Sequence, residues 1–539
     1  GFFRLFGYSP FVPGFFQACA DAGTAVLIYK IASRILSVEN RPRQLVIFAA
    51  GAAGGLGWCF FVPAQAYSII LMPTSWAVFV FWFLVWQIVQ TTTTPSLWRL
   101  LMYGLLIGVT AMGVATILFV VPLFLWAIFA RPPAAPGPLA QSIFRVRAIP
   151  ALVFFLGIIA GTSPCWLHNY LVARDPVFLS AHGGINLWLG NNPEATGYPH
   201  FPGLHAAQSQ MLRDSIVIAE TAAGRALKRS EVSDYWSAKA RSYIASNPMA
   251  WVKLIGVKVA NFWNAFEYDD VGVIATFREH HIVFPGPNFA VIAALGLPGL
   301  LLSFWKFASS RVVAAALLLH MAAVLPIFVT ERYRIAVVPG LLVFGAVGLS
   351  ELWIDCSLGR FRRIVAYFVV LAGALWIVTI PRIDPALWAV QAYNLGRAAL
   401  DSGDLTRAEK HLSRAQAYAS DNPEINFAVA NLRLAQGNRP AAFSLYSAVL
   451  RIDPRHKGAL NNMGVIALDD GKFAEAAQYF RKSLEQEPGN AKTYYLLARA
   501  ELALGNFEPA KTAIAHAVEI EPSRPEYRDL QKEIEKHGH

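Results

Sequence analysis

Two apolar segments flank Gly471 in the stretch Leu460-Asn-Asn-Met-Gly-Val-Ile-Ala-Leu-Asp-Asp-Gly-Lys-Phe-Ala-Glu-Ala-Ala-Gln-Tyr-Phe480. That glycine recurs every 34 residues, at Gly403, Gly437, Gly471 and Gly505. An alanine stands five residues after each of them, at Ala408, Ala442, Ala476 and Ala510. A fixed period of this length predicts a stack of helix pairs. In each pair the glycine makes the turn, and the alanine lies where the two helices approach closely.

This pattern resembles the tetratricopeptide repeat, and the resemblance covers roughly 390–522, or about four repeats. Pro454, Pro488 and Pro522 close the second, third and fourth repeats, because proline cannot continue a helix. The polar segment 523–539 is predicted to form a capping helix. The resemblance implies a surface that binds a protein or peptide, and no catalytic constellation occurs in this segment.

The residues before this array are far more apolar. The whole chain is 55% hydrophobic and 15% charged, with a mean hydropathy of +0.42. Runs of about 18 apolar residues predict membrane-spanning helices. About ten are expected, at 12–33, 44–62, 72–90, 98–112, 114–130, 148–166, 288–304, 312–329, 335–353 and 364–380. The stretch 98–130 fits either two short helices or one long bent helix.

The sequence thus predicts a mainly α protein with two parts. Residues 1–381 form a polytopic membrane domain that includes a large loop domain, 167–287, and residues 382–539 form the repeat domain. Within the loop, helices are expected at 230–246 and 248–266. Because the chain begins with Gly just before an apolar run, we expect that an N-terminal piece is missing.

Positive charges predict the orientation of the membrane domain. They follow alternate spans, at Lys30, Arg34, Arg41, Arg43, Arg99, Arg131, Arg145, Arg147, Lys306, Arg311, Arg360, Arg362 and Arg363. Cationic loops stay in the cytoplasm. We therefore expect an integral membrane protein, with 167–287 and the repeat domain on the extracytoplasmic side. The net charge of +11 is mostly a signal of topology, and no cluster of basic and aromatic residues points to nucleic acid.

Three segments carry a second resemblance. They are Pro164-Cys-Trp-Leu-His-Asn169, Gly184-Ile-Asn-Leu-Trp-Leu-Gly-Asn-Asn-Pro193 and Glu331-Arg-Tyr-Arg-Ile-Ala-Val-Val-Pro339. In this order they resemble motifs of the GT-C membrane glycosyltransferases, closest to bacterial members of the dolichyl-phosphate-mannose–protein mannosyltransferase superfamily (glycosyltransferase family 39). The chain departs from the family pattern at Cys165, where Trp is usual, at His168, where Arg is usual, and at Ala336, where Pro is usual.

The resemblance implies transfer of a sugar from a polyprenyl-phosphate donor to a protein or glycan acceptor on the outer face. Because it is to bacterial members, it also implies the bacterial inner membrane, with the outer face in the periplasm. In the family, a catalytic carboxylate, in some cases associated with a metal, follows the first span. We expect that segment upstream of Gly1, so no catalytic residue is assigned, and a divalent metal is the one cofactor left open. Two other readings stay open: an oligosaccharide ligase or polymerase, and a non-enzymatic membrane scaffold that displays the repeats.

Candidate binding residues lie in these same segments. Arg332, Tyr333, Arg334 and His168 are predicted to bind the lipid phosphate, since Arg matches phosphate with a planar fork of donors. The alternative is that the arginines anchor the interface with Glu331 as partner. Asn186, Asn191, Asn192 and Glu194 are predicted to contact the sugar or acceptor, although Asn beside Gly and Pro also makes turns. The pair Asp269 and Asp270 resembles a divalent site only superficially.

Overall fold

The structure is a computed structural model that describes residues 9–37, 44–132, 143–199, 208–269, 271–381 and 385–537. All regular elements in these ranges are helices. The chain separates into two compact units, Gly1–Arg382 (unit 1) and Ile383–His539 (unit 2). Each unit is described by itself below.

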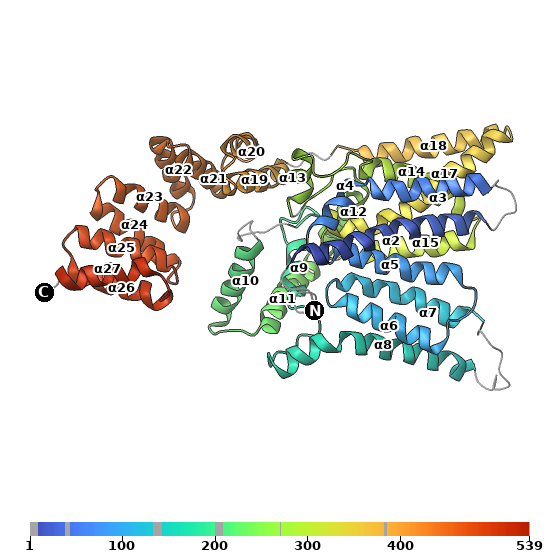
Figure 1. Ribbon diagram of the computed structural model, residues 1–539, viewed down its shortest axis with the longest axis horizontal. Coiled ribbons are helices and arrows are strands. Elements are labelled where there is room, and N and C mark those ends of the chain that lie inside the picture. Colours follow the sequence, from blue (N-terminus) through green and yellow to red (C-terminus); the bar gives the residue numbers. More distant parts are fainter. Residues whose placement is uncertain are drawn as a thin grey trace. The chain divides into compact units, whose positions relative to one another are not determined.

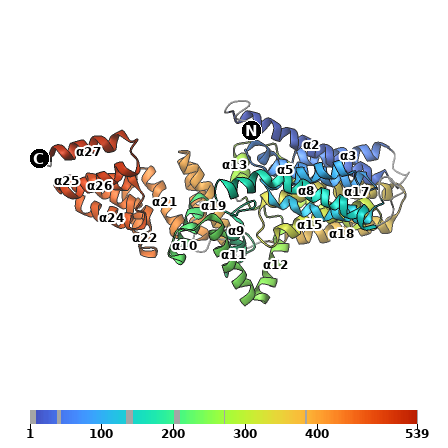
Figure 2. The same ribbon diagram turned by 90° about the horizontal axis from the view of Figure 1, so that it is seen from below.

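Unit 1 is built around a bundle of apolar helices that run side by side (Figures 1 and 2). The bundle consists of α2 (Phe11–Leu36), α3 (Gln44–Cys59), α4 (Val62–Ile69), α5 (Thr74–Gln90), α6 (Leu97–Ala111), η1 (Ala115–Val120), α7 (Val121–Ala130), α8 (Ile143–Leu171), α14 (Phe289–Phe304), α15 (Ala308–Val324), α16 (Glu331–Arg334), η2 (Ile335–Val337), α17 (Val338–Ser357) and α18 (Phe361–Thr379). Each of the ten predicted spans overlaps one of these helices or a consecutive pair. The stretch 98–130 forms two helical segments, α6 and η1–α7, and not one bent helix.

Few of these helices are long enough to cross a bilayer by themselves. Among the described residues, four qualify by length and composition: Phe11–Leu36, Arg147–Leu171, Glu331–Ser357 and Phe361–Thr379. The pair α3–α4, bent by 54°, would make a fifth. The remaining apolar helices have 10–17 residues, which gives at most about 25 Å at ~1.5 Å per residue, less than the ~30 Å of a bilayer core. The ten-span topology therefore stays a prediction.

Glycines let neighbouring helices of the bundle touch backbone to backbone. A Cβ added to Gly104 of α6 would lie 2.2 Å from the carbonyl oxygen of Phe154 in α8. At Gly108 the same atom would lie 2.4 Å from the Ile158 oxygen. Because both residue numbers increase together, α6 and α8 run parallel. Small residues four apart are typical of helices packed inside membranes.

The large loop of unit 1 folds into further helices at one end of the bundle (Figure 1). They are α9 (Gly183–Gly190), α10 (Gln208–Ala223), α11 (Arg229–Ser246), α12 (Pro248–Trp263) and α13 (Val273–Glu279). The predicted helices at 230–246 and 248–266 correspond to α11 and α12. The rings of Trp188 in α9 and Trp236 in α11 pack with centroids 6.0 Å apart. Both belong to a small hydrophobic core of the loop helices, separate from that of the bundle.

Unit 2 consists, over residues 385–537, of four helix pairs and a ninth helix. They are α19 (Pro385–Asp401), α20 (Leu405–Tyr418), α21 (Pro423–Ala435), α22 (Arg439–Ile452), α23 (Lys457–Asp469), α24 (Phe473–Gln486), α25 (Ala491–Ala503), α26 (Phe507–Ile520) and α27 (Pro525–His537). The predicted capping helix corresponds to α27, which buries Tyr527, Leu530 and Ile534 against the last repeat.

The 34-residue register has the structural meaning that the sequence predicts. The four glycines at the inter-helix turns have φ of 79°, 77°, 73° and 77°, at Gly403, Gly437, Gly471 and Gly505 respectively. Other residues avoid this left-handed conformation because their Cβ clashes with the following carbonyl. The four alanines at Ala408, Ala442, Ala476 and Ala510 are each 0% exposed. Glycine is therefore needed for backbone conformation at these four turns, whereas at Gly104 and Gly108 of unit 1 it is needed for close contact.

Candidate functional site

A cavity of about 390 Å³ opens at the end of the bundle that carries α9. Its walls come from the start of α5, the turn between α6 and η1, the segment before α9, α9 itself, the end of α15 and α16. Most lining residues are apolar. The polar ones are Thr74, Thr116, Ser180, Asn186, His320, Arg332 and Tyr333. Such a lining, apolar with a few polar groups, is typical of small-molecule sites.

Arg332 and Tyr333 reach this cavity from the short helix α16. The guanidinium of Arg332 lies 5.1 Å from the centroid of the Tyr333 ring, within cation–π range. Nε2 of His320 lies 2.8 Å from the Tyr333 carbonyl oxygen, and Nε1 of Trp82 donates to the Ala336 oxygen at 2.8 Å. These two hydrogen bonds hold α16 and η2 against α15 and α5. Two of the four predicted lipid-phosphate residues therefore line the cavity.

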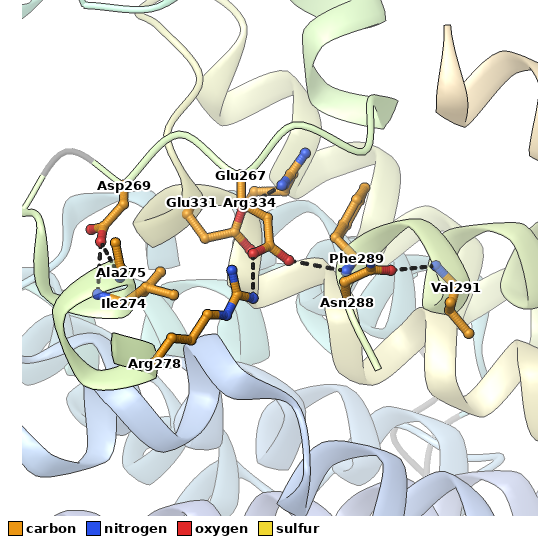
Figure 3. Close-up of polar contacts among 10 residues, drawn as sticks. All are labelled: Glu267, Asp269, Ile274, Ala275, Arg278, Asn288, Phe289, Val291, Glu331 and Arg334. Atoms are coloured by element: carbon orange, nitrogen blue, oxygen red, sulfur yellow. Dashed lines mark hydrogen bonds and ion pairs between the residues drawn. The ribbon is translucent and has the colours of Figure 1, made fainter. Parts of the chain in front are cut away.

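Arg334 does not line the cavity. Its side chain is 1% exposed and pairs with the Glu331 carboxylate (Figure 3). Nη1 donates to the Asn264 carbonyl oxygen at 2.6 Å, and the guanidinium carbon lies 3.8 Å from the centroid of the Phe289 ring. Consecutive helical residues are ~100° apart around the axis, so Arg332 and Arg334 point to different sides. Arg334 takes the role that the sequence left as the alternative, a cation paired with Glu331.

Two further carboxylates lie in the region of this ion pair: Glu267 beside it, and Asp269 at the start of α13 (Figure 3). Glu267 accepts a hydrogen bond from Arg278 Nη2 at 2.7 Å. Asp269 accepts from the backbone N–H groups of Gly272 and Ile274, at 3.0 and 2.7 Å, and so caps α13, while burial raises the pKa of its carboxyl. Asp270 lies outside the described residues. Among the described residues, no group of three or more His, Cys, Asp or Glu side chains could hold a metal ion.

His168 stands exposed near the end of α8 and does not line the cavity. Two other residues of its motif connect to the cavity wall instead. Cys165 Sγ lies 3.4 Å from the Leu179 carbonyl oxygen, and Asn169 Nδ2 donates to the Val177 oxygen at 2.9 Å. Leu179 lines the cavity. The Pro-Cys-Trp-Leu-His-Asn segment therefore does not line the cavity itself, but it positions the stretch that carries Leu179.

Asn191 is buried, and its side chain is fully used inside the protein. Its Nδ2 donates to the carbonyl oxygens of Leu187 and Pro326, at 2.8 and 2.7 Å. Its Oδ1 accepts from Trp251 Nε1 and from Lys258 Nζ, both at 3.0 Å. Since an amide has two donors and two acceptor positions, none is left for a sugar. Asn191 joins α9, α12 and the segment before α16.

Of the other three predicted sugar-contacting residues, one lines the cavity and two do not. Asn192 is buried, donates to the Trp188 oxygen at 3.0 Å and accepts from the Glu194 N–H at 2.9 Å. It thus makes the turn that Asn beside Pro favours. Glu194 is exposed and does not line the cavity. Asn186 does line it, one turn earlier on α9.

Lys258 is a buried cation that the sequence analysis missed. It is 0% exposed on α12, and its Nζ donates to Asn191 Oδ1. Burial lowers the pKa of its amine to about 7. A lysine within the apolar run 248–266 could have indicated a buried cation. The sequence, however, does not show which face of this helix is buried.

Comparison with known proteins bears on unit 2. Tetratricopeptide repeat family models match residues 393–457 and 467–534. Unit 2 is a tetratricopeptide repeat array. Arrays of this kind generally bind proteins or peptides. No curated protein matches the chain.

Solved structures similar to the chain include other repeat proteins. MamA (41-end) from Desulfovibrio magneticus RS-1 is 21% identical over 28% of this chain and 91% of its own, with a TM-score of 0.25. TTC0263, a thermophilic TPR protein from Thermus thermophilus, is 19% identical over 34% and 96%, with a TM-score of 0.24. The Cut9–Hcn1 structure is 11% identical over 93% and 98%, with a TM-score of 0.28. Likenesses at these TM-scores support no inference about unit 1.

Proposed function

We propose that the chain is a membrane glycosyltransferase that moves a sugar from a polyprenyl-phosphate donor to an acceptor on the extracytoplasmic face. One observation carries this proposal. Three segments far apart in the sequence each resemble a glycosyltransferase motif; two of them line one cavity, and the third contacts its wall. The first holds the wall at Leu179, the second contributes Asn186, and the third contributes Arg332 and Tyr333.

Glycines of the second segment support its role in shaping this site. A Cβ on Gly190 would lie 1.7 Å from the Ile327 carbonyl oxygen, and one on Gly184 would lie 1.8 Å from the Ser233 oxygen. Only glycine lets α9 lie directly on both neighbours. The Gly-Asn-Asn-Pro part of the motif thus packs α9 against the chain that leads to Arg332.

The chemistry of the cavity suits a phosphate that carries a sugar and a lipid chain. The Arg332 guanidinium provides the cation that phosphate requires. The Asn186 amide and the hydroxyls of Thr74 and Ser180 are partners for sugar hydroxyls, and apolar walls suit a prenyl chain. The volume, about 390 Å³, falls in the ~300–1,000 Å³ range of small-molecule pockets.

The surface of unit 1 supports placing it in a membrane. Large apolar side chains stand exposed along its helices, among them Leu45 at 74%, Phe361 at 73% and Trp376 at 70%. Large apolar side chains exposed to this extent and in this number are unusual in water and point to a membrane or protein contact. We propose that lipid surrounds these helices, in the bacterial inner membrane, with the 167–287 loop and the repeat array extracytoplasmic.

The repeat array completes the proposal. Arrays of this class bind proteins or peptides, so we assign it the recruitment of a protein or glycan acceptor, or of a partner protein, and no chemical step. An oligosaccharide ligase or polymerase, and a scaffold, remain the alternatives. A scaffold has no use for a cation that lines a cavity of this kind.

A binding measurement tests the central claim. Wild-type protein in lipid nanodiscs should bind a polyprenyl-phosphate hexose, and Arg332→Ala should weaken binding about ten- to a hundredfold, since a hydrogen bond to a charged group is worth about 1.5–3 kcal/mol. Arg241→Ala, which removes an exposed arginine of α11, is the matched control and should bind normally. Absence of binding by the wild type, or equal binding by Arg332→Ala, would refute the proposal.

Labelling tests the topology separately. In a variant that lacks the four native cysteines, Asp234→Cys in α11 and Ser402→Cys after α19 should both react with a membrane-impermeant maleimide on intact spheroplasts. Both positions are exposed. Reaction of one position alone would rule out a common extracytoplasmic side.

A further inference from the structure

His320 is a buried polar residue for which the proposed function has so far no role. It lies in α15, is 4% exposed and lines the cavity. Its ring packs edge-on against Phe81 with centroids 5.6 Å apart, while Nε2 lies 2.8 Å from the Tyr333 carbonyl oxygen. The ring is thus fixed from two sides.

These contacts decide which nitrogen carries the proton. A carbonyl oxygen can only accept, so Nε2 of His320 must be the donor to Tyr333. No carboxylate among the described residues forms an ion pair with His320, and a buried charge without a partner is costly. The ring is therefore neutral, and Nδ1 is an acceptor.

Nδ1 has no hydrogen-bond partner among the described residues, although the atom is buried. An acceptor left in this state costs free energy, so it is seldom retained without a reason. The phosphate diester proposed for Arg332 cannot satisfy it, because an ionised phosphate only accepts hydrogen bonds. The missing partner must donate, and the donor that a lipid-linked sugar offers is a hydroxyl.

We propose that His320 Nδ1 accepts a hydrogen bond from a hydroxyl of the sugar whose phosphate binds Arg332. This inference rests on the proposed function and adds the residue that distinguishes a glycosylated lipid from the bare lipid phosphate. His320 then has two tasks through two nitrogens. Nε2 positions the Arg332–Tyr333 turn, and Nδ1 selects a sugar with a hydroxyl beside the phosphate.

Two substitutions separate these tasks. In His320→Gln, the terminal amide can replace Nε2 and keep the donor to the Tyr333 oxygen, but no acceptor stands at the Nδ1 position. In His320→Asn, the shorter amide can replace Nδ1 but cannot reach the Tyr333 oxygen. His281→Gln changes an exposed histidine that does not line the cavity and serves as the matched control.

The experiment measures binding of two probes to the full chain in nanodiscs: polyprenyl phosphate, and the same lipid carrying a hexose. His320→Gln should bind the bare lipid phosphate like the wild type and the glycosylated lipid about tenfold more weakly. His320→Asn should weaken both, because Arg332 loses its support. Equal binding of both probes by His320→Gln and wild type would overturn the inference and leave the proposed function standing. A wild type that binds neither probe would overturn both.

Deoxy sugars extend the test without depending on the stability of a variant. One lipid-linked deoxyhexose should bind the wild type about tenfold more weakly than the parent, and His320→Gln should show no further loss with it. If every deoxyhexose bound the wild type like the parent sugar, no sugar hydroxyl would contact Nδ1, and the inference would be overturned.

Discussion

Unit 1 and unit 2 are both helical, but they distribute polar and apolar residues in opposite ways. In unit 2, the exposed large apolar side chains are scattered among charged residues, and the buried carboxylate of Glu501 is paired with Arg481 and Asn506. In unit 1, apolar side chains cover the outside, while Lys258 and His320 lie inside. This difference is the one expected if lipid surrounds the bundle, as proposed above, while the repeat array faces water.

The largest effect expected from this comparison concerns Lys258, which, unlike Glu501, has no oppositely charged partner among the described residues. Burial lowers the pKa of the Lys258 amine to about 7 in the folded protein, from 10.5 when unperturbed. Between these values the unfolded chain binds more protons, so stability rises with pH from about 7 to 10.5, and below pH 7 the penalty is fully present. At ~1.4 kcal/mol per pH unit, the penalty is roughly 5 kcal/mol.

Lys258→Met should remove this dependence. Its gain in melting temperature over the wild type should be greatest near pH 7 and shrink towards pH 10, as followed by thermal unfolding in detergent. Lys253→Met, an exposed lysine on the same helix, is the control and should give the same small difference at every pH. A pH-independent gain for Lys258→Met would show that the buried amine is not neutral at high pH.

The next effect distinguishes Arg334 from Arg332, although the sequence analysis predicts the same phosphate-binding role for both. Arg334→Met leaves Glu331 buried without its cation and should cost about 3–5 kcal/mol of stability. Arg332→Met should cost far less stability but should weaken binding of a polyprenyl-phosphate hexose. Adding Glu331→Gln to Arg334→Met should recover part of the loss, measured by thermal unfolding. A reversed order of the two stability losses would contradict the assignment.

A third effect tests the packing register of unit 2. Ala476 is fully buried between helices, so Ala476→Leu should overpack the repeat and cost about 1–3 kcal/mol. Ala474→Leu, at an exposed position on the same helix, should change stability by less than about 0.5 kcal/mol. Chemical denaturation of the separately expressed residues 383–539, followed by circular dichroism, gives both values. Equal losses would mean that the alanine register has no packing role.

The smallest effect contrasts the two uses of glycine. Gly471 has φ +73° with open space around it, so Gly471→Val should cost about 1–2 kcal/mol, whereas Gly471→Asn should be nearly neutral. In unit 1, any Cβ on Gly104 meets the α8 backbone, so Gly104→Asn should be as harmful as Gly104→Val. Thermal unfolding of the four variants tests whether conformation or space is limiting at each site.

The sequence predicted elements better than it predicted side-chain directions. The repeat array follows from the 34-residue register, and every apolar run predicted as a span overlaps a helix. Short helices such as α9 and α13 were missed, since seven or eight residues carry little periodic signal. Of the candidate site residues, Arg332, Tyr333 and Asn186 line the cavity, while Arg334, His168, Asn191, Asn192 and Glu194 do not.

The sequence by itself determined the helical class and the repeat array. These features depend on local spacing, because each repeat buries its apolar face on its immediate neighbours. Only the tertiary structure decided that Arg332 faces the cavity while Arg334 pairs with Glu331, and that Asn191 meets Lys258. Residues two apart on a helix point to different sides, and which side is buried depends on helices distant in sequence.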